Sequence, residues 1–103
     1  MLFRKILFIS LLLVFSSSVS ADPKMKLGLE VFNNKAQCGV CHMLLSAGSE
    51  GQIGPNLDML KPLMPQIITA VTKGIGVMQA WEGILTYEEI EAVAYYVFNS
   101  TNK

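Results

Sequence analysis

The sequence has few of the residue types that build most metal sites and enzyme active sites. Its 103 residues include one histidine, His42, and two cysteines, Cys38 and Cys41. A structural zinc ion usually takes four Cys or His ligands, so a zinc site in this chain would lack its fourth ligand. No group elsewhere is placed like a general base beside a substrate pocket. We therefore expect that the protein is not an enzyme.

The chain also lacks an excess of positive or negative charge. Eight basic residues balance eight acidic residues, and the formal net charge is zero. Domains that bind nucleic acid carry clustered Lys and Arg in clear excess, because they neutralise phosphates. The composition therefore excludes nucleic acid as a partner.

The chain has no apolar run long enough to span a bilayer. The longest run, residues 6–15, is shorter than the roughly 20 residues that a transmembrane helix needs. Two basic residues precede the run, and Val19-Ser20-Ala21 after it fits a signal-peptidase site. We expect a cleaved signal peptide, residues 1–21, and an exported periplasmic domain, residues 22–103, without a stable membrane span. The alternative is an uncleaved membrane anchor.

Both cysteines and the histidine fall in one pentapeptide, Cys38-Gly39-Val40-Cys41-His42. Cys-x-x-Cys-His is the attachment sequence of c-type haem. Two thiols three positions apart on a helical turn can each add to one vinyl group of the haem. The next residue, His42, can then offer a neutral imidazole nitrogen to the iron. The motif predicts one covalently bound haem c, attached through Cys38 and Cys41.

Three other interpretations of the cysteines remain open. A structural disulfide over this spacing would be strained and would leave His42 unexplained. A thioredoxin-like redox pair belongs to a fold with a sheet, and the sequence has no clear strand. A zinc site lacks its fourth ligand.

The first helix is predicted over residues 23–34. Gly28 and Phe32 lie four residues apart there, as do Leu27 and Val31. Glycine inside a helix costs about 1 kcal/mol relative to alanine, so Gly28 indicates close approach of another helix. Residues 43–64 form a long connection rich in turn residues, which we expect to wrap around the haem.

Two further helices are predicted in the C-terminal half. Pro65 suits the first position of a short helix over residues 66–73, and Gly74 suits its end. Residues 74–83 form a loop too apolar for solvent, which we expect to fold against the haem. Thr86 and Glu89 form a capping box that opens a last helix to about residue 99. The predicted fold is all-α, with three to four helices around one covalently attached haem.

The second axial ligand of the iron must come from another residue type, because no second histidine exists. Methionine sulfur is the natural candidate, and it would raise the reduction potential. Methionine is also a common core filler, so each candidate must be weighed. We favour Met78, which follows two glycines in the apolar loop, over the other candidates: Met25, Met43, Met59 and Met64.

These features together resemble the small class I monohaem c-type cytochromes of bacteria, over essentially the whole of residues 22–103. Five motifs carry the resemblance in order: Gly28 with Phe32, Cys38 to His42, Gly54-Pro55-Asn56-Leu57, Gly74-Ile75-Gly76-Val77-Met78 and Tyr96-Val97. The resemblance implies a cytochrome c fold around the haem.

The resemblance also implies roles for single residues. Pro55 is expected to present its carbonyl to the far nitrogen of His42, and Met78 to be the sixth ligand. Gly28 and Phe32 are expected to cross the last helix near Tyr96. The family commonly has proline after the methionine, where this chain has Gln79.

These observations predict a monomeric periplasmic electron carrier that docks transiently to redox partner proteins at the haem edge. The Gly-Pro-Asn-Leu-Asp and Gly-Ile-Gly-Val-Met segments also resemble those of certain periplasmic cytochromes. The resemblance implies a carrier that accepts electrons from a soluble dehydrogenase, such as a molybdenum sulfite dehydrogenase. The alternative function is a haem-based gas-binding or sensor protein with a labile sixth ligand, which Gln79 favours. A further variant makes the chain a fixed subunit of a dehydrogenase.

Overall fold

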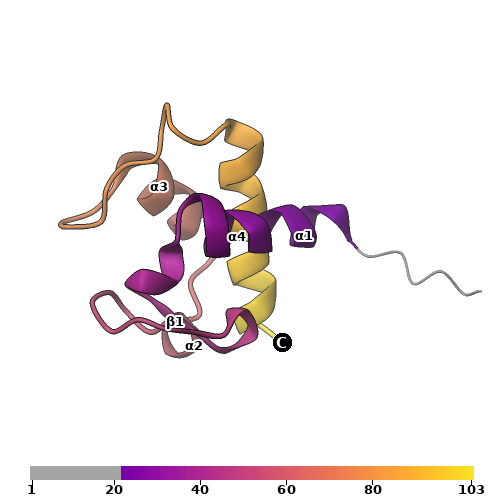
Figure 1. Ribbon diagram of the computed structural model, residues 1–103, viewed down its shortest axis with the longest axis vertical. Helices are drawn as coiled ribbons and strands as arrows, with labels where there is room; N and C mark the ends of the chain where they lie inside the picture. Colours follow the sequence, from indigo (N-terminus) through magenta and orange to yellow (C-terminus); the bar gives the residue numbers. More distant parts are fainter. Residues whose placement is uncertain (1–21) are drawn as a thin grey trace, which may run out of the picture.

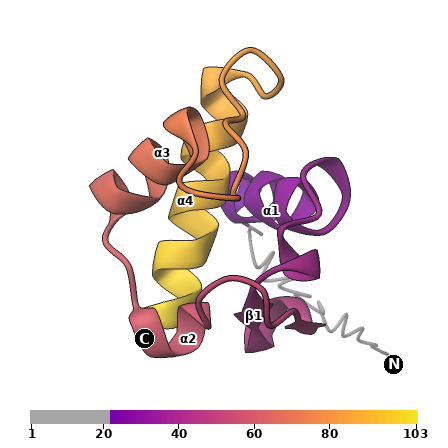
Figure 2. The same cartoon turned by 90° about the vertical axis from the view of Figure 1, so that its left-hand side faces the viewer.

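The computed structural model describes residues 22–103, so the predicted signal peptide lies outside the described residues. Four α-helices form the framework: α1 (Pro23–Glu30), α2 (Leu57–Leu60), α3 (Met64–Lys73) and α4 (Tyr87–Thr101). Helix α4 runs through the length of the molecule, with α1 crossing it and α3 beside it (Figures 1 and 2). The prediction of a helical fold is confirmed.

Helix α1 begins at a side-chain cap and ends in a widened turn. The Asp22 carboxylate accepts hydrogen bonds from the backbone N–H groups of Lys24 and Met25, at 3.0 and 3.4 Å. The helix then continues as a π-helical segment, η1 (Val31–Lys35), in which Ala36 N donates to Val31 O at 2.8 Å. The helical region therefore extends one residue beyond the predicted end.

The crossing of α1 and α4 depends on Gly28, as the sequence predicted. A Cβ atom at Gly28 would overlap the carbonyl oxygen of Ala92 and the Cβ of Tyr96. One turn later, the rings of Phe32 and Tyr96 pack with their centroids 6.1 Å apart. The absence of a side chain at Gly28 lets the two backbones meet, and this crossing builds one wall of the core.

The predicted connection over residues 43–64 contains more structure than its turn-rich sequence indicated. Strands β1 (Met43–Leu44) and β2 (Ser49–Glu50) pair antiparallel around a 3₁₀ turn, η3 (Leu45–Ala47). Helix α2 follows, capped by Asn56, whose side chain accepts from Met59 N at 3.3 Å. Two-residue strands are too short to show an alternating pattern, which explains why they could not be recognised from the sequence.

Local signals define the last two helices. Helix α3 begins at Met64, two residues before the predicted start, because Gln66 accepts a hydrogen bond from Leu63 N at 2.9 Å. It ends at Gly74, whose φ of +76° suits glycine. The predicted capping box opens α4: Glu89 N donates to Thr86 Oγ1, and Thr86 N donates to the Glu89 carboxylate. The buried faces of α3 and α4 include Ile67, Val71, Ile90, Val93, Ala94 and Val97.

Within residues 22–103, no helix is long and apolar enough to cross a membrane.

Candidate functional site

The pentapeptide from Cys38 to His42 is wound into a tight helical turn. The 3₁₀ segment η2 (Cys38–Val40) begins after Gln37, which has a φ of +51°. Cys41 N and His42 N both donate to Cys38 O, at 3.2 and 3.0 Å. The turn therefore keeps Cys38, Cys41 and His42 within one short arc of backbone, as attachment to a single haem edge requires.

The imidazole of His42 is oriented by the segment that contains Pro55. Its Nδ1 lies 2.8 Å from the carbonyl oxygen of Pro55, the contact that the resemblance implied. Gly54 stands directly against the ring, and Gly54 N donates to Cys41 O at 2.7 Å. A carbonyl accepts only from a protonated Nδ1, so Nε2 is the nitrogen left to bind a metal.

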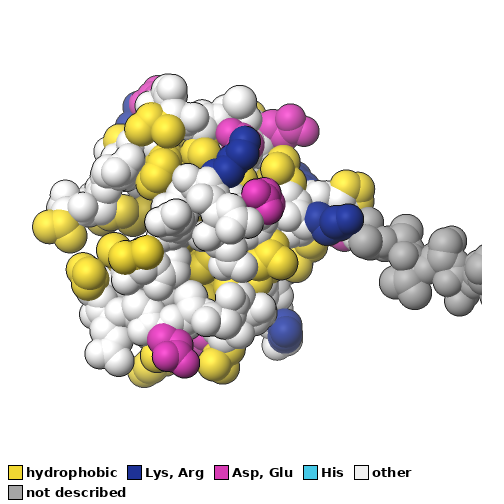
Figure 3. All heavy atoms as spheres, in the orientation of Figure 1, with side chains coloured by type: hydrophobic (Ala, Val, Ile, Leu, Met, Phe, Trp, Pro, Cys, Tyr) yellow, Lys and Arg dark blue, Asp and Glu magenta, His cyan; other side chains and the backbone are white. Residues whose placement is uncertain are grey.

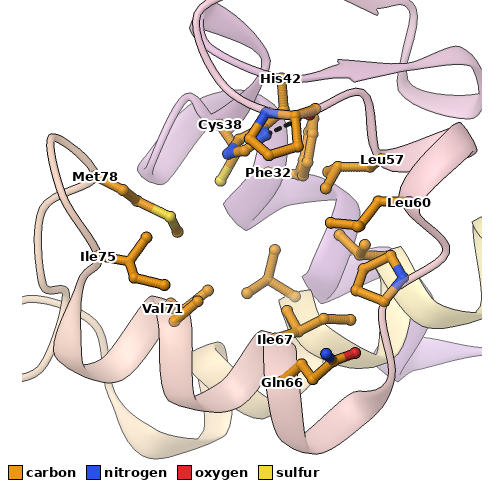
Figure 4. A pocket seen from close by; sticks show the side chains of 15 residues that line it. Phe32, Cys38, His42, Leu57, Leu60, Gln66, Ile67, Val71, Ile75 and Met78 are labelled. Atoms are coloured by element: carbon orange, nitrogen blue, oxygen red, sulfur yellow. Dashed lines mark hydrogen bonds between the residues drawn. The ribbon is translucent and has the colours of Figure 1, made fainter.

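Two adjoining cavities, of about 250 and 460 Å³, open beside the turn. Both are lined by Cys38, His42, Pro55, Ile75 and Met78, so they are two parts of one cleft. The smaller, deeper part is walled by apolar side chains: Phe32, Leu57, Leu60, Ile67, Val71, Val93 and Val97. Among residues 22–103, Gln66 is the only amide side chain that lines this part (Figure 4).

This cleft suits haem in shape and chemistry. Together the two parts fall in the size range of cofactor pockets, roughly 300–1,000 Å³. A porphyrin is a large apolar plate, and the deep walls are apolar. The attachment cysteines and His42 lie at one end, so the residues present fit a covalently held haem.

The structure separates Met78 from the other methionines. Met78 projects into the cleft from the loop 74–83, whereas His42 and Cys38 enter from another wall (Figure 4). Met59 is 80% exposed, and the sulfur of Met43 accepts a hydrogen bond from Asn56 at 3.2 Å. Met25 and Met64 pack against the hydrophobic core. None of these four lines the cleft.

The competing interpretations of the cysteines gain no support from the structure. Cys38 and Cys41 are not joined by a disulfide. In the chain without haem, burial raises the pKa of the Cys38 thiol to about 11, whereas redox-active thiols need a lowered pKa. Residues 22–103 contain no group of three or more His, Cys, Asp or Glu side chains that could hold a metal ion.

Some lining residues were not singled out from the sequence. Val40, Ile53 and Trp81 line the outer part of the cleft. Val40 and Ile53 are single apolar residues in polar or turn-rich segments, where no periodicity identifies a face. Trp81 lies in the loop that was predicted to fold against the haem, and its apolar ring is the signal that could have identified it.

Comparison with known proteins places the chain in a family. A sequence model of the family described as "Cytochrome C oxidase, cbb3-type, subunit III" matches residues 23–97. Cytochrome c6 of Microcystis aeruginosa is 36% identical over 80 residues, which cover 74% of this chain and 96% of that protein. The chloroplastic cytochrome c6 of Chlamydomonas reinhardtii is 34% identical over 99 residues; this match covers 86% of this chain but only 63% of the length of that protein.

A solved structure supports the same assignment. The c-type cytochrome SorU from Sinorhizobium meliloti shares 51% sequence identity with this chain and superposes with a TM-score of 0.73. The match covers 79% of this chain and 94% of SorU. The predictions of a cytochrome c fold, of covalent haem c and of a protein that is not an enzyme are confirmed. The chain therefore belongs to the family of this sequence model and is a small c-type cytochrome, an electron-transfer protein with haem bound through Cys38 and Cys41.

Proposed function

We propose that this protein is an exported, monomeric single-electron carrier in which His42 and Met78 are the two axial ligands. The observation that carries the proposal is the position of Met78. Of the methionines in the described residues, it alone lines the cleft that His42 also enters. When bound, the haem supplies an iron that passes between the ferrous and ferric states with one electron.

The residues around the cleft support a carrier whose ligands stay in place. The Pro55 carbonyl holds the His42 ring and leaves Nε2 for the iron. A thioether ligand from Met78 and an apolar wall that excludes water both favour the ferrous state, and so raise the reduction potential. The buried walls from α3 and α4 leave little room for rearrangement between the two oxidation states.

The mouth of the cleft indicates how partner proteins dock. Val40, Ile53 and Val77 line the outer part and are 64%, 69% and 92% exposed. No charged side chain lines either part of the cleft among residues 22–103. On the left-hand side of Figure 3, apolar side chains gather while charged ones lie above, below and to the right.

We therefore place the docking surface at this apolar rim, close to the cysteines that attach the haem. Redox partners form small, short-lived interfaces, and exposed apolar side chains can supply the contact without tight ionic pairing. The partner on the donor side is a soluble dehydrogenase, with the molybdenum sulfite dehydrogenase type as the specific candidate. The periplasm is the proposed compartment, reached through the signal peptide over residues 1–21.

The ligand assignment is tested by optical spectra of protein made with a c-type maturation system. We expect covalent haem and an oxidised sulfur-to-iron charge-transfer band that Met78→Ala abolishes and the matched control Met59→Ala preserves. The reduced protein should not take up carbon monoxide. A band that survives Met78→Ala would refute the ligand assignment.

Two alternatives predict different results. Ready binding of carbon monoxide by the reduced wild-type protein would indicate a labile sixth ligand and favour a gas-binding or sensor function. Stable co-purification with a large redox enzyme would favour a fixed subunit, a possibility that the oxidase-subunit description of the matching family also raises. Rapid reduction by a purified sulfite dehydrogenase and sulfite would support the proposed donor, and slow reduction would exclude that donor type.

A further inference from the structure

The loop that carries Met78 is closed by backbone hydrogen bonds at that residue. Ile75 N donates to Met78 O, and Met78 N donates to Ile75 O, each at 2.9 Å. This reciprocal pair defines a tight turn with Gly76 and Val77 at its tip. Both the N–H and the carbonyl of Met78 are therefore satisfied within the turn.

Gly76 has the backbone conformation that closes this turn. Its φ is +56°, whereas Val77 is not among the residues with positive φ. Positive φ at only the first of the two tip residues is the pattern of a type II′ turn, which strongly prefers glycine there. A Cβ at Gly76 would meet nothing within 4 Å. A substitution at Gly76 would therefore act through the backbone conformation and not through crowding.

The rest of the loop is tied to helix α3. Trp81 N donates to Val71 O at 2.8 Å, which returns the chain to the helix three residues after Met78. On the other side, Gly74 packs so closely that a Cβ there would lie 2.7 Å from Met78 O. The turn projects away from these ties, and its tip residue Val77 is 92% exposed.

We propose that Gly76 is a positioning residue for the sulfur of Met78. A methionine side chain has three rotatable bonds, so its sulfur stays in one place only if its backbone is held. The closed turn supplies that restraint, and Met78 reaches the cleft from it (Figure 4). The restraint keeps the sixth ligand in place although the residue that follows is Gln79, which is exposed and does not fix its own backbone as proline would. This inference rests on the proposed ligation by His42 and Met78.

The test compares glycine substitutions in the haem-loaded protein. Gly76→Ala should lower the equilibrium constant for closing the turn by roughly tenfold, because an L-residue disfavours positive φ. Gly76→Asn should have a smaller effect, although asparagine is larger than alanine, because asparagine tolerates positive φ. The readouts are the intensity of the sulfur-to-iron charge-transfer band and the rate of carbon monoxide uptake after reduction.

Two glycines serve as matched controls. Gly48 and Gly83 have φ of +70° and +87°, and a Cβ at either would meet nothing within 4 Å. Gly48→Ala and Gly83→Ala should therefore carry a similar backbone cost while leaving the Met78 band and the carbon monoxide rate near wild type. Circular dichroism of all variants reports whether the helical fold is kept.

The outcomes separate this inference from the proposed function. A charge-transfer band that survives Met78→Ala refutes the ligation and the inference with it. If Met78→Ala abolishes the band but Gly76→Ala behaves like wild type, the ligation stands and the positioning role is refuted. The positioning role would also be refuted if Gly83→Ala changed the charge-transfer band as much as Gly76→Ala does. A larger change with Asn than with Ala at position 76 would refute it as well.

Discussion

Gly54 lies against the imidazole of His42, at the point where His42 Nδ1 meets the carbonyl oxygen of Pro55. A Cβ atom at Gly54 would come within 2.6 Å of His42 Cε1 and 2.9 Å of Nδ1. The hydrogen bond of 2.8 Å to Pro55 therefore depends on the absence of a side chain one residue earlier. A glycine in a turn-rich segment here controls the orientation of the residue proposed to bind the iron.

Gly54→Ala should move the His42 ring and weaken its hydrogen bond to Pro55. Forcing a methyl group into a filled site typically costs about 1–3 kcal/mol of unfolding free energy. Because the imidazole is displaced, we also expect a changed reduction potential. Denaturant titration and potentiometry of the haem-loaded variant measure the two effects. An unchanged potential would show that the ring tolerates the extra methyl group.

Gly28→Ala should destabilise the fold by about 1–3 kcal/mol, because its Cβ would overlap the Ala92 carbonyl and Tyr96. In an ordinary exposed helix, the same change from glycine to alanine would stabilise the helix by about 1 kcal/mol. The sign of the change in denaturation midpoint therefore tests the α1–α4 crossing. The exposed Lys26→Ala in the same helix is the control, and the potential should stay near wild type in both variants.

Glu89 links the protein's stability to pH. Hydrogen bonds from Lys35 and from the Thr86 backbone hold the pKa of this carboxyl below its usual value. The lowered pKa stabilises the fold above the unfolded-state value of about 4.3, and this contribution is lost as pH falls through the folded-state pKa.

Glu89→Gln should therefore lower stability at neutral pH and flatten the loss of stability below about pH 4.5. Thermal unfolding from pH 3 to pH 7 measures the profile. Glu88→Gln, a change at an exposed residue of the same helical turn, should keep the wild-type profile. A stability profile of Glu89→Gln that parallels the wild-type profile would contradict the link between Glu89 and the pH dependence of stability.

Val77→Ser should slow electron transfer with a protein partner severalfold, because the change removes apolar contact area from the proposed docking rim. Val77 is 92% exposed, so stability should hardly change. Stopped-flow reduction by a partner dehydrogenase measures the rate, and reduction by ascorbate serves as a reference that needs no docking. Leu45→Ser, at a residue 77% exposed outside the cleft, is the matched variant.

The same stopped-flow measurements, repeated at different salt concentrations, test whether charge or apolar contact controls docking at the rim. Exposed charge pairs weaken as salt rises, since the screening length is about 8 Å at physiological ionic strength. A rim without charged side chains should give a rate that changes little between low and high salt. A steep fall in rate with salt would show that charges outside the cleft control docking.

Much of the site could be predicted because its chemistry is local in the chain. The spacing of Cys38, Cys41 and His42 is set by covalent attachment to one haem edge, so it is visible without a fold. The capping box of Thr86 and Glu89 likewise depends on residues three positions apart, and it opens α4 as predicted. Gly28 was recognisable because a glycine in a helix needs a compensating contact.

Other features could not be established from the sequence, because they depend on packing between distant segments or are too short to leave a pattern. The sequence favoured Met78 among the five methionines of residues 22–103, but only packing shows that it alone of them lines the cleft. The short strands β1 and β2 leave no periodic signal. The widened turn η1, where α1 meets α4, has no local marker either.

The sequence by itself determined the haem attachment, the helix caps and the need for close helix packing, because each follows from bonds or contacts within a few residues. The tertiary structure showed the expected contact of Pro55 with His42, and it showed that the favoured Met78 lines the cleft. Only the tertiary structure decided that Gly54 packs against the His42 ring and which apolar side chains surround the mouth. Those relations arise when segments from both halves of the chain close around one cleft, and burial, unlike capping, is a property of the whole fold.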